Sequence, residues 1–216
     1  MKQSLLIGGS PYQVIVTNKQ NEAGDWVQEL FRLPREETTV VGVSFSRCNE
    51  TIRGETILQW INSIHLACSS RALVYHLTSS ADGSILPRQL LFILCDPSYL
   101  FIGEEIISGL ELLGLKTKPP LMPTLDLRDV PASSASLDGP SAPNGVHCTL
   151  RFSLLPSWTW PLNDDKVEEA VQTAVVAEKI GKRVIKRTNV SAIDQRMHLG
   201  MIRTSLRDMT TDFAPR

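Results

Sequence analysis

Apolar residues recur along the chain in short runs that predict a series of β-strands. Four of the runs are rich in β-branched and aromatic residues, the side chains that strands favour. They are Tyr12–Thr17, Thr39–Ser46, Ala72–Leu77 and Tyr99–Ile102. A fifth apolar run, Ile57–Cys68, is separated from the run at Ala72 by three polar residues, which predicts two strands joined by a tight turn.

Other segments carry apolar residues three or four positions apart, a spacing typical of amphipathic helices. They are Asn21–Leu33, Leu86 to about Pro97, and Glu104–Leu113 followed by Gly114. A further helix is expected to begin at Asn163, whose side chain can cap it, and Asp164 and Asp165 suit the positive end of its dipole. Leu125–Val130 reads as a short strand or turn. Strands followed by alternating strands and helices predict an α/β fold, with a mixed sheet flanked by helices.

The chain is expected to form one domain over residues 1–180. Within it, residues 131–147 are rich in proline, serine, alanine and glycine, a composition that predicts a flexible loop. Residues 181–216 are expected to form a basic, weakly amphipathic C-terminal tail. Such a tail can pack on its own domain, pair with a second copy, or dock a partner. The pattern leaves these three alternatives open.

Composition is that of an ordinary globular protein, with 42% hydrophobic and 21% charged residues and a formal net charge of -1. Any affinity for nucleic acid would therefore need a local basic patch. The four cysteines are far apart, which argues against a zinc site or a disulfide framework. No apolar run is long enough for a signal peptide or a membrane span, so we expect no membrane contact and an intracellular location, cytoplasmic or nuclear. His65 and His76 fall in apolar strands and are expected at the core edge with one hydrogen bond each.

Five segments, in order, are similar to motifs of one enzyme family. They are Val40–Ser46, Leu66–Leu77, Ile85–Gly103, Asp126–Arg128 and Ser157–Ala174. Their order and spacing resemble the DnaQ-like 3′–5′ exonucleases, and among these the Werner-syndrome-type exonuclease domain as it occurs in plants. The similarity extends from about Gln13 to Ile180. It implies a ribonuclease-H-like fold, a mixed sheet flanked by helices.

The resemblance also implies where the chemistry would lie. The family hydrolyses nucleic acid with two Mg²⁺ or Mn²⁺ ions, which four carboxylates hold. The matching positions here are Ser44, Ser46, Gly109 and Thr173, and Glu169 stands at the position of the family's tyrosine. Because strand side chains alternate, Ser44 and Ser46 should share one face while the residues between them face the core. No carboxylate is left at these positions, so we expect no metal cofactor and no cleavage.

Two further sets of residues have alternative interpretations. Glu105 and Glu169 each lie one helical turn before a lost carboxylate, so they are a rival metal site; otherwise they are solvated helix residues. A run of basic residues at helical spacing could contact nucleic acid, or could be a solvated helix end. The run consists of Lys182, Arg183, Lys186 and Arg187.

The sequence therefore predicts a catalytically inactive exonuclease-like domain, a pseudo-nuclease. Its expected role is that of a protein-interaction or oligomerisation module, with a protein partner or a second copy of itself. Two alternatives stay open. One is a non-cleaving nucleic-acid binder of weak affinity, and the other is a weak metal-dependent 3′–5′ exonuclease with a shifted metal site.

Overall fold

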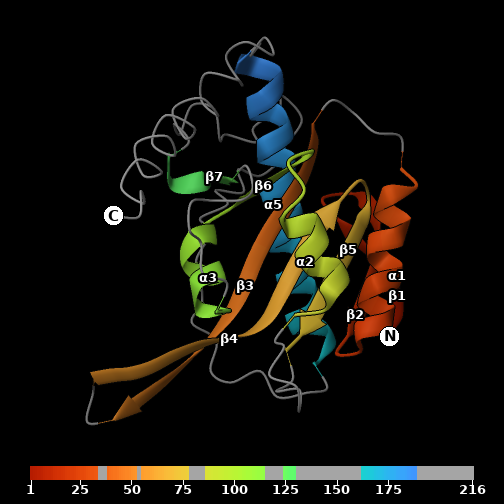
Figure 1. The fold of residues 1–216 in the computed structure, drawn as a ribbon. Helices are drawn as coiled ribbons and strands as arrows, with labels where there is room; N and C mark the ends of the chain where they lie inside the picture. Colours follow the sequence, from red (N-terminus) through yellow and green to blue (C-terminus); the bar gives the residue numbers. More distant parts are fainter. Residues whose placement is uncertain (34–37, 53–54, 78–85, 115–123, 130–161, 189–216) are drawn as a thin grey trace, which may run out of the picture.

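The computed structural model describes residues 1–33, 38–52, 55–77, 86–114, 124–129 and 162–188 (Figure 1). These residues form a seven-stranded mixed sheet with the strand order β1-β2-β5-β4-β3-β6-β7. The strands are β1 (Lys2–Ile7), β2 (Ser10–Thr17), β3 (Thr39–Ile52), β4 (Glu55–Cys68), β5 (Arg71–His76), β6 (Tyr99–Gly103) and β7 (Thr124–Asp126). The helices are α1 (Gln20–Phe31), α2 (Arg88–Leu94), α3 (Ile106–Leu112) and α5 (Asp164–Thr188), with a 3₁₀ turn η1 (Leu127–Asp129).

Strand pairing confirms the predicted mixed sheet. β3, β4 and β5 form an antiparallel meander, while β2 pairs in parallel with β5, and β6 joins β3 and β7 in parallel. The predicted tight turn between β4 and β5 is present, and Ser69 and Ser70 both have positive φ there. Strand β1 is an addition that the sequence pattern did not predict. It lies at the edge of the sheet, antiparallel to β2.

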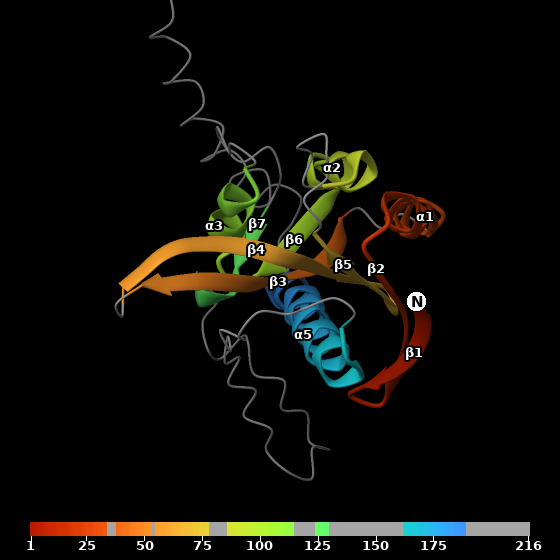
Figure 2. The same ribbon diagram turned by 90° about the horizontal axis from the view of Figure 1, so that it is seen from below.

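Helices cover both faces of the sheet. In Figure 2, α1, α2 and α3 lie on one side and α5 lies on the other. Val41, Val43 and Phe45 of β3 pack in the core beneath α1, α2 and α3, as alternation predicted. The residues between them face α5, and Gly42 shows how close this helix lies. A Cβ added at Gly42 would stand 1.8 Å from the carbonyl oxygen of Ala174.

Helix α5 begins where the sequence predicted. The Asn163 side chain accepts a hydrogen bond from the Lys166 N–H at 3.1 Å, which caps the first turn. The helix then runs through residue 180 without interruption to Thr188, and both Ile180 and Gly181 are buried. The predicted loop at 131–147 and the tail beyond 188 lie outside the described residues. None of the helices in the described ranges combines the length and hydrophobicity that a membrane span requires.

Strands β3 and β4 continue well beyond the rest of the sheet. β6 pairs only with the Thr39–Gly42 part of β3, and β5 pairs only with the Ser63–Cys68 part of β4. Within the part of the chain that the structure describes, the two strands pair only with each other from Arg47 and Ile61 outward. The result is a two-stranded ribbon that projects from the body of the molecule (Figures 1 and 2).

Candidate functional site

The positions that match the first family motif lie in a polar cluster beneath α5. Two cross-strand pairs of β3 and β4 form it: Ser44 opposite His65, and Ser46 opposite Ser63. All four side chains are buried, with at most 8% of any one exposed. Ser44 and Ser46 therefore share one face, as the sequence predicted, but they lie in a closed interior.

Hydrogen bonds hold this cluster together around the imidazole of His65. Its Nδ1 lies 2.9 Å from the Ser44 hydroxyl. Its Nε2 lies 3.2 Å from the Ser46 hydroxyl and 2.9 Å from that of Ser63. Since a hydroxyl can donate or accept, either neutral tautomer of the ring is satisfied on both sides. The expectation of a single hydrogen bond for His65 is wrong.

Burial also fixes the charge of the cluster. It lowers the pKa of His65 from 6.5 to about 3, because the imidazolium would lose its hydration beneath α5. Burial lowers the pKa of His76 as well, and His76 stands opposite Ser63 on β5. At neutral pH the cluster is therefore an imidazole ring surrounded by three hydroxyl groups, with no net charge.

Such a donor set does not suit a hard divalent cation. Mg²⁺ requires oxygen ligands, chiefly carboxylates, in near-octahedral geometry. The cluster contains no carboxylate, and both ring nitrogens of His65 are engaged by serine hydroxyls. Across the described ranges, no group of three or more histidine, cysteine, aspartate or glutamate side chains could hold a metal ion.

The two remaining degenerate positions lie on different faces of the sheet. Thr173 is on α5, and its hydroxyl donates a 2.9 Å hydrogen bond to the carbonyl of Glu169 one turn earlier. Gly109 is on α3, across the sheet. A Cβ added there would stand 2.4 Å from the ring of Phe45. The structure therefore does not bring Gly109 to the face that carries Ser44 and Ser46.

The two glutamates of the rival metal site are also separated. Glu169 is exposed on α5, whereas Glu105 precedes α3 on the opposite face (Figure 2). Glu105 forms ion pairs with Arg47 and with Arg128, the latter at 3.3 Å. Its side chain is thus engaged by two guanidinium groups, and the structure does not place it near Glu169.

The surroundings of Glu105 form a second polar cluster, which is charged and lies at the surface. Asp126 accepts the Glu105 N–H at 3.0 Å and binds Arg128 through both carboxylate oxygens. Burial alone would raise the pKa of Asp126, but its hydrogen bonds and ion pair with Arg128 outweigh burial and lower it. Burial, followed by the charge of Asp126, raises the pKa of Glu104. This cluster fixes the start of α3 against β7, a structural role.

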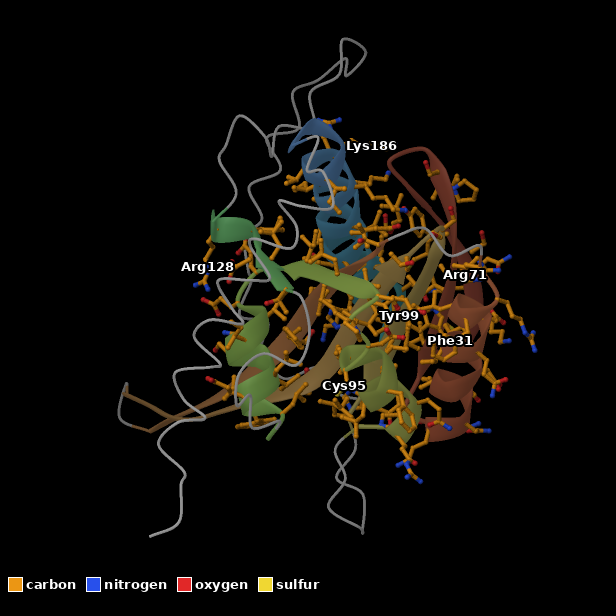
Figure 3. All side chains as sticks on the ribbon, turned by 45° about the horizontal axis from the view of Figure 1, so that its top comes forward. Phe31, Arg71, Cys95, Tyr99, Arg128 and Lys186 are labelled. Atoms are coloured by element: carbon orange, nitrogen blue, oxygen red, sulfur yellow. The ribbon has the colours of Figure 1, made fainter. Side chains whose placement is uncertain are left out.

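The basic run on α5 is only partly available for a ligand. Lys182 binds Glu178 at 2.6 Å, and Glu178 is a buried carboxylate that also accepts the Ser69 N–H at 2.8 Å. Lys186 is exposed near the end of the helix, well away from Arg128 (Figure 3). The side chain of Arg187 lies outside the described residues. Glu178 is a residue that the sequence analysis missed.

The first half of α5 has the opposite charge. Its exposed acidic residues are Asp164, Asp165, Glu168 and Glu169. Gly42 packs against Ala174 and Glu178, and Gly181 packs against Val40. The earlier part of the helix therefore lies alongside Ser44 and Ser46, so the acidic half of α5 covers the candidate site.

Comparison with known proteins identifies the fold. No protein-family model matches the chain, and no curated protein matches it. The crystal structure of Trypanosoma brucei RNase D in complex with the RNA U12 has a TM-score of 0.52 and 16% identity, over 77% of this chain and 61% of its own. The catalytic core of RRP6 from Trypanosoma brucei has a TM-score of 0.51 and 11% identity, over 82% of this chain and 48% of its own.

The chain therefore spans between about half and three-fifths of the length of these two structures. At this level of identity the likeness concerns the fold. It confirms the predicted ribonuclease-H-like fold of 3′–5′ exonucleases, a mixed sheet flanked by helices.

Proposed function

We propose that this chain is a catalytically silent exonuclease-fold domain that acts as a protein-interaction module. The observation that carries this proposal is the buried cluster of Ser44, Ser46, Ser63 and His65 at the motif that supplies two metal ligands in the enzymes. We further propose that the domain is a degenerate member of the Werner-type branch. The order of its sequence motifs supports that assignment.

Electrostatics support the loss of catalysis. Two divalent ions must give up much of their hydration to bind, and anionic ligands offset that cost. Here the corresponding groups are neutral, and protonation of His65 would add a positive charge that repels a cation. The hydroxyls of Ser44 and Ser46 are already bonded to His65. The cluster satisfies its own polar groups without a metal.

Charge distribution favours a protein partner over nucleic acid. The acidic half of α5 covers the face where a substrate strand would approach the degenerate motif, and it repels phosphates. The basic residues lie at the far end of the helix, and Lys182 among them is bound to Glu178. A non-cleaving nucleic-acid binder is thus the competing function, and among the described side chains of the basic run Arg183 and the exposed Lys186 would carry it.

A nuclease assay tests the loss of catalysis. Labelled single-stranded and 3′-recessed substrates are incubated with the full chain and Mg²⁺ or Mn²⁺, and we expect no shortening. Glu169→Gln is the control variant, because it removes the acidic residue at the family's tyrosine position. Metal-dependent 3′ trimming that co-purifies with the chain and disappears in Glu169→Gln would contradict the proposal and support a shifted metal site.

Fluorescence anisotropy separates the two kinds of binding. We expect no appreciable binding of single-stranded RNA or DNA at physiological salt. Binding that weakens steeply with salt, and that is lost in Arg183→Ala/Lys186→Ala but not in Lys2→Ala/Lys19→Ala, would instead favour the nucleic-acid binder.

A further inference from the structure

An apolar groove lies between α1 and α2 on the face of the sheet opposite α5. It encloses a volume of about 390 Å³ and is lined by residues of both helices and of the turn that follows α2. Two phenylalanines contribute to it although both are exposed, Phe31 to 41% and Phe92 to 63%. The exposed Cys95 also lines it. Aromatic side chains left open around a hollow of this size are typical of a surface that receives apolar groups.

The groove lies close to the edge of the sheet at which β3 and β6 begin. These two strands are parallel, and their first residues, Thr39 and Tyr99, are register partners. The ring of Phe31 stands edge-on to the ring of Tyr99, with 6.4 Å between the two centroids. Phe31, Cys95 and Tyr99 are labelled in one region of Figure 3. The end of the groove therefore faces the start of β3 and β6.

Helix α5 leaves the sheet at this same edge. A Cβ added at Gly42 would meet Ala174, whereas one added at Gly181 would stand 3.0 Å from the side chain of Val40. Later residues of α5 thus lie beside earlier residues of β3, so the helix runs antiparallel to the strand. Residues Lys182–Thr188 continue past the start of β3, and the chain that follows them begins near the groove.

The sequence after α5 carries an apolar stripe of the kind that such a groove receives. Apolar residues recur at alternating spacings of three and four, the spacing that places side chains on one face of a helix. They are Leu199, Ile202, Leu206, Met209 and Phe213. Pro215 follows the last of them, where a proline suits the end of a helix. The pattern predicts one amphipathic helix over residues 199–213.

We propose that residues 199–213 dock as this helix in the groove between α1 and α2 of the same chain, with the apolar stripe against Phe31 and Phe92. The mode is that of an amphipathic helix in an apolar groove. The inference goes beyond the proposed function and does not depend on it. A protein partner that binds this groove would have to displace the chain's own helix.

The length of the connecting segment favours the chain's own helix over that of a second copy. One layer of packing lies on each side of the sheet, so α5 and the groove are separated by two layers of about 10 Å each. The connection, residues 189–198, spans up to about 33 Å when extended. A short flexible connection of this kind gives an effective concentration on the order of millimolar. A second copy would compete only at similar protein concentrations.

The thiol of Cys95 reports whether the groove is covered. The full chain is labelled with a small maleimide, and the rate constant for Cys95 is followed by mass spectrometry of its peptide. Leu206→Asp/Met209→Asp, the stripe variant, should raise this rate constant about tenfold or more, because the charged stripe cannot stay docked. Thr204→Asp/Thr211→Asp is the matched control. It adds the same charge to the opposite face of the helix and should leave the rate constant unchanged.

A double-mutant cycle locates the docking site. In a Phe92→Asp background the stripe variant should lose most of its effect on the rate constant. In an Ile107→Asp background it should keep its full effect, because Ile107 is 47% exposed on α3 and does not line the groove. Circular dichroism and thermal unfolding check that each variant is folded.

Three results would overturn the proposal. Equal rate constants for the stripe variant and its control would show that the stripe does not cover Cys95. A full effect of the stripe variant in the Phe92→Asp background would place the stripe elsewhere on the domain. Protection of Cys95 that increases with protein concentration would show that the occupant is the helix of a second copy. Protection that stays constant on dilution supports docking within one chain.

Discussion

The neutral state of His65 predicts a specific loss of stability in mild acid. In the unfolded chain the imidazole takes up a proton near pH 6.5, whereas in the folded protein its pKa is about 3. The unfolded state therefore binds more protons between these values, and the free energy of unfolding falls as the pH is lowered. Between pH 7 and pH 5 the expected loss from this residue is about 2 kcal/mol, at 1.36 kcal/mol per pH unit.

The assay is urea denaturation of the wild type and of His65→Gln at pH 7 and pH 5. Glutamine keeps one donor and one acceptor but does not titrate, so the difference between the two proteins isolates His65 from all other groups. His76→Gln is a matched control with a smaller expected effect, because His76 is less deeply buried than His65. Equal pH dependence in wild type and His65→Gln would refute the view that burial holds the ring neutral.

Two further predictions concern the packing of α5. Gly42→Ala should lower the free energy of unfolding, measured by urea denaturation, by about 1–3 kcal/mol, the usual cost of overpacking. The reason is that the added Cβ meets the backbone of Ala174. Gly24→Ala should be tolerated, because its Cβ would meet only the end of a flexible side chain. Glu178→Gln should lower the pKa of Tyr12 from about 12, but not as far as its usual 10.0, because burial is the largest cause of the shift and the Glu178 carboxylate is the next. The absorbance of the phenolate measures this pKa. An unchanged pKa would show that the carboxylate plays no part.

Local patterns predicted most of the elements, because β-branched runs and helical spacing report the burial of each segment. They failed where pairing rather than composition determines the structure. Lys2–Ile7 is a strand because β2 pairs with it, although its first residues are polar. β3 continues from Ser46 to Ile52 through residues of low apolar content because β4 pairs with it along that whole stretch.

The site was predictable in part. Alternation along β3 placed Ser44 and Ser46 on one face, and the structure agrees. It could not place His65 between them, because that depends on the register of β3 against β4. The available signal was a second pair of polar residues two apart, Ser63 and His65, in another apolar strand. Glu178 gave no such signal, since a glutamate four residues before a lysine is ordinary on a helix surface.

The dependence of the sheet on α5 has a consequence for how the chain folds during synthesis. Strands β1 to β5 and helix α1 are complete by His76, whereas α5, the described cover of the second face, begins only at Asp164. Until that segment leaves the ribosome, water can reach Gly42, Ser44 and His65. The pKa of the His65 imidazole is then no longer lowered by burial beneath α5. Closure of the domain is therefore a late, long-range step, and a nascent chain stalled before Asp164 would present an open sheet to chaperones.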